Sequence, residues 1–270
     1  MNAGLVRGQY STGLSRGNIE QALVAAGKDV DQLQPADLAL LEDFHTLGRI
    51  ATGQLVELID ISHQTRVLDA GSGIGGSARF VADRYGCRVT AADLTEEYCD
   101  TCDWLDRLVG LDSQISVRQA DVTALPFADA GFDVVLSQHV QMNVADKARL
   151  YSEARRVLVS GGQLALWDIT IGGRGELDYP LPWATRPEVS HLVTPDQLKS
   201  SIESAGFEIE CWNDLTDQAA STMQALLALP PNPLGLHAFV ADFAEKAGNL
   251  TAALSDGRLR AIQGVARATD

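Results

Sequence analysis

The stretch Val67-Leu68-Asp69-Ala70-Gly71-Ser72-Gly73-Ile74-Gly75-Gly76-Ser77-Ala78 decides the fold. It has the pattern of a buried strand that runs into a glycine turn and then a helix, the unit in which a nucleotide-like ligand lies against the N-terminus of the helix. Gly71, Gly73 and Gly76 satisfy the G-x-G-x-x-G spacing of dehydrogenases. Asp69, however, stands two residues before the first glycine, where its carboxylate would repel a pyrophosphate and attract a cation. The stretch therefore favours a cationic ligand without phosphate.

The length and charge of the chain limit the classes of function. Its 270 residues suffice for one large domain, or for one domain with an appended cap. The net charge of −15 argues against nucleic acid or an anionic membrane as the main partner, because both attract basic surfaces. No apolar stretch is long enough to span a bilayer, and the N-terminal residues lack the apolar core of a signal peptide. We expect a cytoplasmic protein whose partner is a small molecule.

The four cysteines do not form a metal-binding pattern. Cys99 and Cys102 make an isolated C-x-x-C, but it falls in the expected helix 96–109 and has no second cysteine pair or nearby histidine to complete a zinc site. We interpret both as ordinary helix cysteines, with redox or metal chemistry as the alternative. No metal site is expected.

Strands and helices alternate along the middle of the chain. The pattern predicts strands at 66–70, 88–93, 115–119, 132–138, 162–168 and 207–212, and helices at 75–84, 96–109, 146–158 and 195–205. Such alternation predicts an α/β fold, with a mostly parallel sheet covered by helices on both faces.

The two ends of the chain depart from this alternation. A short apolar helix is expected at 19–26, and apolar residues spaced three and four apart predict an amphipathic helix from 38 to 58. A helical stretch near 233–254 is followed by a last strand near 258–267, whose residues could instead continue as helix. The expected domains are a helical N-terminal cap at 1–62, a ligand-binding core at 63–170, an irregular lid insert at 171–194, and a completion of the sheet at 195–270.

Acidic residues stand at the carboxyl ends of three successive predicted strands, namely Asp69, Asp93 and Asp121. In an open parallel sheet, ligands bind beyond the carboxyl ends of the strands, so these residues belong to one site. Asp93 lies 22 positions after Gly71, where an acid accepts hydrogen bonds from both ribose hydroxyls. Asp121 would accept from an adenine amino group while the Val122 backbone amide donates to the ring. Three acids with no basic residue among them suit a nucleoside without phosphate.

From these motifs the chain resembles the class I S-adenosylmethionine (SAM)-dependent methyltransferases over roughly residues 45–215. The resemblance rests on 67–80, 91–94, 120–127, 131–135 and 154–162, in this order and spacing. It implies a Rossmann-like seven-stranded sheet with the last strand antiparallel, SAM as cofactor and S-adenosylhomocysteine as product. The implied cofactor-binding residues are Asp69, Gly71, Ser72, Gly73, Asp93, Leu94, Asp121, Val122, Gln138 and His45.

Within the family, 73–80 with Ser137-Gln138-His139 and Asp146-Lys147 is similar to the sarcosine/dimethylglycine methyltransferases, which implies methylation of an amine nitrogen. The segment 133–147 is also similar to quinone C-methyltransferases, so O- or C-methylation of a phenolic or quinone-type ring is the alternative. His139 stands where the amino-acid-methylating branch has an acid or a small residue. A NAD-dependent dehydrogenase, disfavoured by Asp69, and a non-catalytic SAM-binding protein are further alternatives.

The reaction is a displacement at a methyl carbon that the sulfonium already activates, so alignment and exclusion of water matter most and a base is optional. His139 is the best-placed candidate base, since imidazole titrates near neutral pH, or it only shapes the wall. Asn143, Tyr179, Trp183 and His191 are expected to contact the substrate. Tyr179 and Trp183 can form an aromatic wall with cation-π attraction of roughly 0.5–2 kcal/mol, or Trp183 anchors the loop. The apolar N-terminal helices could close the pocket or form a homodimer contact.

Overall fold

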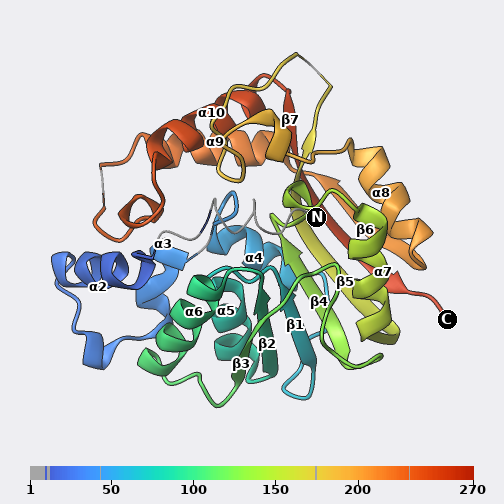
Figure 1. Ribbon diagram of the computed structural model, residues 1–270, viewed down its shortest axis with the longest axis horizontal. Coiled ribbons are helices and arrows are strands. Elements are labelled where there is room, and N and C mark those ends of the chain that lie inside the picture. The colour runs from blue at the N-terminus through green and yellow to red at the C-terminus, as the bar shows by residue number, and fades with distance from the viewer. Residues whose placement is uncertain (1–9, 11–12, 43, 174, 231) are drawn as a thin grey trace.

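The protein is described by a computed structural model, which places residues 10, 13–42, 44–173, 175–230 and 232–270. A seven-stranded sheet runs through its centre in the order β3-β2-β1-β4-β5-β7-β6 (Figure 1). Its strands are β1 (Arg66–Ala70), β2 (Arg88–Asp93), β3 (Ile115–Gln119), β4 (Phe132–Gln138), β5 (Leu158–Ile171), β6 (Phe207–Asp214) and β7 (Leu259–Ala268).

Seven strands form along the chain where the sequence predicts them, and the last strand is antiparallel, as the resemblance implies. The first five strands pair in parallel, whereas β7 runs antiparallel to both β5 and β6. The residues at the end of the chain form this strand rather than continuing as helix. The strand predicted at 162–168 is too short, because the Gly161-Gly162 pair, expected to form a turn before the strand, lies within β5. Gly161 instead takes a φ of +73°, and the pairing with β4 shifts register nearby.

Helices cover both faces of the sheet, as predicted. On one face lie α4 (Arg49–Val56), α5 (Gly76–Tyr85) and α6 (Glu96–Leu108), and on the other α7 (Lys147–Val157) and α8 (Pro195–Ser204). Alternate residues of the strands enter two separate cores. In β5, for example, Trp167 packs under the first set of helices and Leu166 under the second. The carboxyl ends of the parallel strands are therefore fixed from both sides.

The single helix predicted for 38–58 is wrong. The structure has the short helices η2 (Pro35–Leu38) and α3 (Ala39–Glu42), and α4 then begins only at Arg49. Between α3 and α4 the backbone leaves the helical region, with positive φ at Leu47 (+67°) and Gly48 (+49°). Leu58, which the helical spacing placed on the buried face, is 40% exposed. The remainder of the predicted cap contains α2 (Ser15–Ala25) and η1 (Val30–Gln32), while 1–9, 11–12 and 43 lie outside the described residues.

The helical stretch predicted for 233–254 is also only partly right. A helix that the sequence reading missed, α9 (Thr216–Leu227), precedes it, and only the short η5 (Leu236–Ala238) forms before α10 (Phe243–Ser255). The reason is local, because Pro233 and Gly235 interrupt the helix and Asp242 adopts a left-handed φ of +55°. In Figure 1, α9 and α10 lie side by side beyond the carboxyl ends of the parallel strands.

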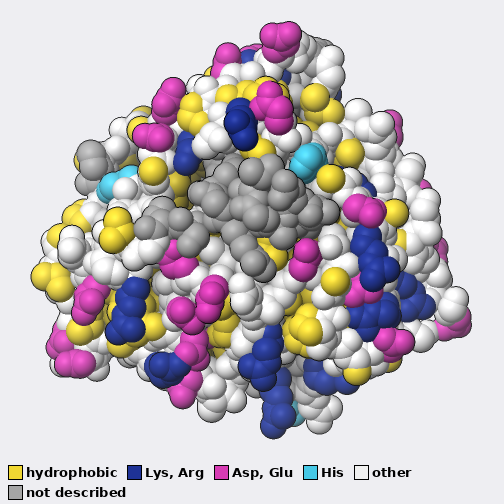
Figure 2. Space-filling model, in the orientation of Figure 1, with side chains coloured by type: hydrophobic (Ala, Val, Ile, Leu, Met, Phe, Trp, Pro, Cys, Tyr) yellow, Lys and Arg dark blue, Asp and Glu magenta, His cyan; other side chains and the backbone are white. Residues whose placement is uncertain are grey.

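The segment predicted to be a lid, 171–194, is irregular, with one short helix, η4 (Pro187–Val189). None of the helices in the described part of the chain is long and apolar enough to cross a membrane. On the face shown in Figure 2, acidic and basic side chains are interspersed.

Candidate functional site

The glycine turn after β1 is held against β2 by backbone hydrogen bonds. The amides of Gly71 and Ser72 both donate to Ala92 O, at 2.8 and 3.0 Å. Gly71 needs to be glycine for two reasons: its φ is +86°, and a Cβ there would lie 2.4 Å from the Val140 side chain. Gly75, with a φ of +89°, is the N-cap residue of α5, and a Cβ there would lie 2.3 Å from Cys102 Sγ. The turn therefore fits closely between the loop after β4 and α6.

Asp69 lies under this turn as a buried and incompletely paired carboxyl group. It is 2% exposed, and its Oδ2 has no hydrogen-bond partner. Burial and the nearby Asp93 raise the pKa of Asp69 to about 7. The Ser72 Oγ is likewise buried without a partner. Two orphaned polar atoms at one strand end mark a place where a ligand can supply the missing partners.

Asp93 is the last residue of β2, and Asp121 lies two residues after the end of β3. Asp93 accepts from Gly73 N at 2.9 Å and from Thr95 N at 2.8 Å, so its carboxylate is held in place by the turns on either side. Burial raises the pKa of Asp93. Asp121 receives both of its hydrogen bonds, from the amide and the hydroxyl of Thr123, on Oδ1. Next to these acids, Val122 is buried and Leu94 is half-buried.

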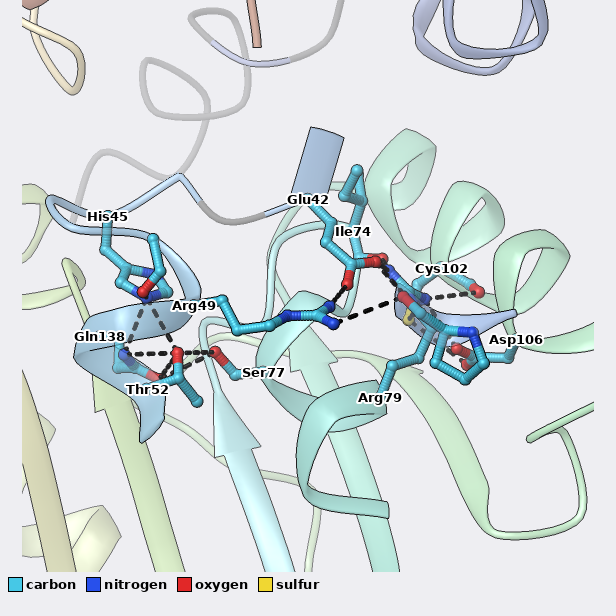
Figure 3. Close-up of polar contacts among 12 residues, drawn as sticks. Glu42, His45, Arg49, Thr52, Ile74, Ser77, Arg79, Cys102, Asp106 and Gln138 are labelled. Carbon is cyan, nitrogen blue, oxygen red and sulfur yellow. Dashed lines mark hydrogen bonds and ion pairs between the residues drawn. The ribbon is translucent and has the colours of Figure 1, made fainter. Parts of the chain in front are cut away.

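His45 lies in the break between α3 and α4, not in a helix as predicted. Its Nε2 is 3.0 Å from both Gly48 O and Thr52 Oγ1 (Figure 3). Burial lowers the pKa of His45 to about 4, so the ring is neutral. Gln138 is buried beside it. Its side-chain Nε2 lies 3.1 Å from the same ring nitrogen, and its Oε1 accepts a hydrogen bond from Ser77 Oγ at 2.8 Å. The polar ends of α4, α5 and β4 thus meet in one network.

A buried ion-pair cluster joins the cap to the domain. Arg79 is fully buried and contacts Glu42 at 2.8 Å and Asp106 at 2.7 Å (Figure 3). Glu42 also pairs with Arg49 across the break between α3 and α4. The Arg79 side chain additionally donates to Ile74 O in the glycine turn. A single guanidinium therefore fixes α3, α6 and the ligand-binding turn together, because leaving any of these charges unpaired in the interior is costly.

His139 follows β4 with a φ of +55°, which is uncommon for a residue with a side chain. Its backbone amide donates to Trp167 O at 2.8 Å, and its ring Nε2 faces Thr46. The centroids of the His139 and His45 rings are 6.1 Å apart. Burial and the neighbouring His45 hold the pKa of His139 well below its usual range. Both histidines at this site are thus neutral at physiological pH.

The loop after β4 is tied to the predicted lid. The His191 amide donates to Met142 O at 2.8 Å, and the buried Lys147 Nζ donates to His191 O at 2.7 Å and to Gln141 O at 2.6 Å. Burial lowers the pKa of Lys147 to about 8. Asn143 does not cap α7, since Asp146 does so. The Oδ1 of Asn143 instead accepts a hydrogen bond from the Tyr10 hydroxyl at 3.2 Å.

Two of the predicted substrate residues, Trp183 and Tyr179, pack in or against the hydrophobic core. Trp183 is 2% exposed within the core, and its indole N–H donates to Ser190 Oγ at 3.0 Å. Tyr179 is half-buried and packs against the same core. The structure brings His191 and Asn143 to the loop that carries His139, whereas the indole N–H of Trp183 bonds within the predicted lid. Among the described residues, no group of three or more His, Cys, Asp or Glu side chains could hold a metal ion.

Comparisons with known proteins agree with this geometry. Residues 68–166 match the methyltransferase domain family. The chain is thus similar to methyltransferase domains over β1 to β5. It is 34% identical over 152 residues to the sarcosine/dimethylglycine N-methyltransferase of Halorhodospira halochloris, and 30% identical over 176 residues to the glycine/sarcosine/dimethylglycine N-methyltransferase of Actinopolyspora halophila.

These matches cover 56% and 65% of this chain, but only 54% and 31% of the two relatives, so the chain spans about a third to a half of their length. A solved structure, a putative sarcosine dimethylglycine methyltransferase from Galdieria sulphuraria, superposes with a TM-score of 0.68 at 18% identity. The superposition covers 94% of this chain and 99% of that one. At this identity the likeness concerns the fold.

The residues of this site fit SAM, the cofactor that the resemblance implies. The orphaned Asp69 Oδ2 and Ser72 Oγ offer polar partners beside a turn that a Cβ would fill. In the described part of the chain, no ion pair joins a basic side chain to Asp69, Asp93 or Asp121. Such a set suits a cationic nucleoside better than a dinucleotide with its pyrophosphate.

The sequence assigned no individual role to Thr46, Arg79 or Lys147, although Arg79 and Lys147 lie in segments that carry the resemblance. Thr46 lay inside a helix that the apolar spacing predicted, and the two charged residues carry no sign of burial in the sequence. A usable signal existed only for Lys147, which directly follows the residue that caps α7.

Proposed function

We propose that the protein transfers a methyl group from SAM to the nitrogen of a small-molecule amine. The observation that carries this proposal is the set of acids at three neighbouring strand ends around a glycine turn, with a buried unpaired carboxyl oxygen on Asp69. The similarity to two N-methyltransferases of glycine-derived amines supports an amine as acceptor.

The residues at the strand ends would hold SAM, which supplies an activated methyl group when bound. Asp69 would neutralise part of its positive charge, and Asp93, already oriented by Gly73 N and Thr95 N, would accept from the ribose hydroxyls. Asp121 and the Val122 amide would bind the adenine edge. In this role Leu94, Gln138 and His45 remain expectations, and the Gln138 amide and His45 Nε2 already contact other side chains.

The neutral histidines favour an amine over a phenol. A base must take a proton from a phenol or an activated carbon before attack, and an imidazole whose pKa is well below its usual range does this poorly. An amine can lose its proton to water before it enters the site, and then needs only alignment. His139 would therefore bind or orient the acceptor, together with Asn143 and His191 on the same loop and lid. Tyr179 and Trp183 stay predictions, with Trp183 placed to anchor the lid.

The predicted partners also remain proposals: a small-molecule acceptor, no nucleic acid, no membrane and a possible homodimer, in the cytoplasm. Interspersed acidic and basic side chains on the face in Figure 2 support the absence of a polyanion partner. Sedimentation over a range of concentrations tests the dimer.

The function is tested by binding and turnover together. Calorimetric titration should give binding of SAM and S-adenosylhomocysteine, with no binding of NADH. Incubation with SAM and a panel of amines, phenols and quinols should then give S-adenosylhomocysteine and a methylated amine. Methylation of a phenol or ring carbon would transfer the assignment to O- or C-methylation. Binding of SAM without turnover on any class would leave a SAM-binding protein, and binding of NADH alone would refute the proposal.

A further inference from the structure

The Nε2 of His139 is held by two donors from one residue. The Thr46 amide lies 3.4 Å from this nitrogen and the Thr46 hydroxyl lies 3.2 Å from it. A backbone amide can only donate, so Nε2 is the acceptor and carries no proton. The ring nitrogen that carries the proton in a neutral histidine is set by the bond that the other nitrogen makes. The proton of the His139 ring therefore lies on Nδ1.

Trp167 fixes the direction of the hydroxyl bond. Its indole N–H donates to Thr46 Oγ1 at 2.8 Å, and an indole N–H cannot accept. The hydroxyl uses a lone pair for this bond, and its own hydrogen is free to point at His139 Nε2. Trp167 is fully buried and Thr46 is 2% exposed, so water does not compete for either group. The chain of donors thus runs one way, from Trp167 through Thr46 to His139.

The other ring nitrogen is left available. Within the described residues, no hydrogen-bond partner is found for His139 Nδ1, while the residue is half-buried at the end of β4. The backbone φ of +55° shows that the fold holds His139 in an unfavourable conformation, as is frequent at functional sites. Four residues along the same loop, the Asn143 Oδ1 is occupied by the Tyr10 hydroxyl, which leaves its amide hydrogens as donors.

We propose that His139 is a fixed hydrogen-bond donor, whose Nδ1–H binds an acceptor oxygen that the substrate carries beside its amine, and that Thr46 and Trp167 are the positioning residues that hold this tautomer. The substrate part rests on the proposed function, whereas the tautomer does not. His139 then does not act as a base. Proton uptake at Nε2 would displace both Thr46 donors, and uptake at Nδ1 would first require that nitrogen to lose its own proton.

The tautomer is measured directly by nitrogen NMR on protein with ¹⁵N-labelled histidine, because protonated and unprotonated ring nitrogens differ widely in chemical shift. The His139 signal is assigned by its loss in His139→Asn. The wild-type protein should show a protonated Nδ1 and an unprotonated Nε2, and Thr46→Val should lower the share of this tautomer. A wild-type ring with its proton on Nε2 would overturn the proposal, whether or not the protein methylates amines.

Kinetics test the donor role with amines that carry, or lack, a carboxylate or phosphoryl oxygen. Asparagine places an amide near the position of Nδ1 and tolerates a positive φ, so His139→Asn should raise KM less than His139→Leu. For oxygen-bearing amines, His139→Leu should raise KM by roughly tenfold to a hundredfold, as expected for a lost hydrogen bond to a charged group. Exposed His63 provides the control, since His63→Leu should change neither constant. Equal loss of kcat in both His139 variants, with folding intact, would indicate a base and refute the donor role.

Discussion

SAM affinity should depend strongly on pH through Asp69. In the free protein, burial and Asp93 raise the pKa of this carboxyl to about 7, so at pH 5 nearly all of it is protonated. A bound cation favours the carboxylate and lowers its pKa, by about 1–3 units for a neighbouring charge. Binding then releases a proton, and affinity falls as the pH falls below 7.

The magnitude follows from the two pKa values. If the pKa in the complex returns to the ordinary 3.8, the Kd for SAM should be roughly fiftyfold weaker at pH 5 than at pH 7. The comparison of Kd values stops at pH 7, because the α-amino group of SAM itself titrates near pH 8 and would add its own pH dependence. Calorimetry in buffers of different ionisation enthalpy should also detect release of close to one proton at pH 6.

Asp69→Asn provides the matched control. The amide has nearly the same size and cannot ionise, so the variant should bind SAM more weakly at pH 7 and lose the pH dependence. A wild-type Kd that changes less than twofold between pH 5 and 7 would refute the assignment of Asp69 as the group that meets the cation.

Three further substitutions, two of them with a matched control, test the site and its supports. Gly71→Ala should abolish SAM binding, because its methyl group would stand 2.4 Å from a valine side chain. Gly86→Ala, with a similar φ but open space, should bind normally and lose only some stability. Arg79→Met leaves two carboxylates buried and should lower the free energy of unfolding by about 3–5 kcal/mol in urea titration, whereas Arg66→Met breaks an exposed pair and should cost about 0–1 kcal/mol. Trp183→Ala should lower it by about 3–5 kcal/mol, because the ring is buried; a raised KM with unchanged stability would instead favour a substrate wall.

The sequence predicted β1 to β4 with their observed bounds because each is a buried run between clear turn signals. It failed between α3 and α4, where the apolar spacing continues across the break. Leu41 and Leu47 are both buried, so the pattern alone cannot show that the backbone between them is not helical. The missed α9 illustrates the opposite error, since its stripe of buried residues is short and carries few large apolar side chains.

The acids of the candidate site were predictable because parallel strands bring their carboxyl ends together. The partners of those ends were not. Arg79 is fully buried only because Glu42 and Asp106, from distant elements, surround it, and Thr46 meets His139 across 93 positions of sequence. No local pattern records contacts of this range. The chemistry of His139, and with it the choice between base and donor, therefore became accessible only from the fold.

The most direct test of the account follows the methyl group itself. The protein is incubated with SAM that carries a trideuterated methyl group and with a secondary or tertiary amine that bears a carboxylate, and the products are analysed by mass spectrometry. The account predicts equal amounts of S-adenosylhomocysteine and an amine product with the deuterated methyl group on nitrogen. Label on oxygen or carbon, or binding of SAM with no labelled product from any amine, would contradict it.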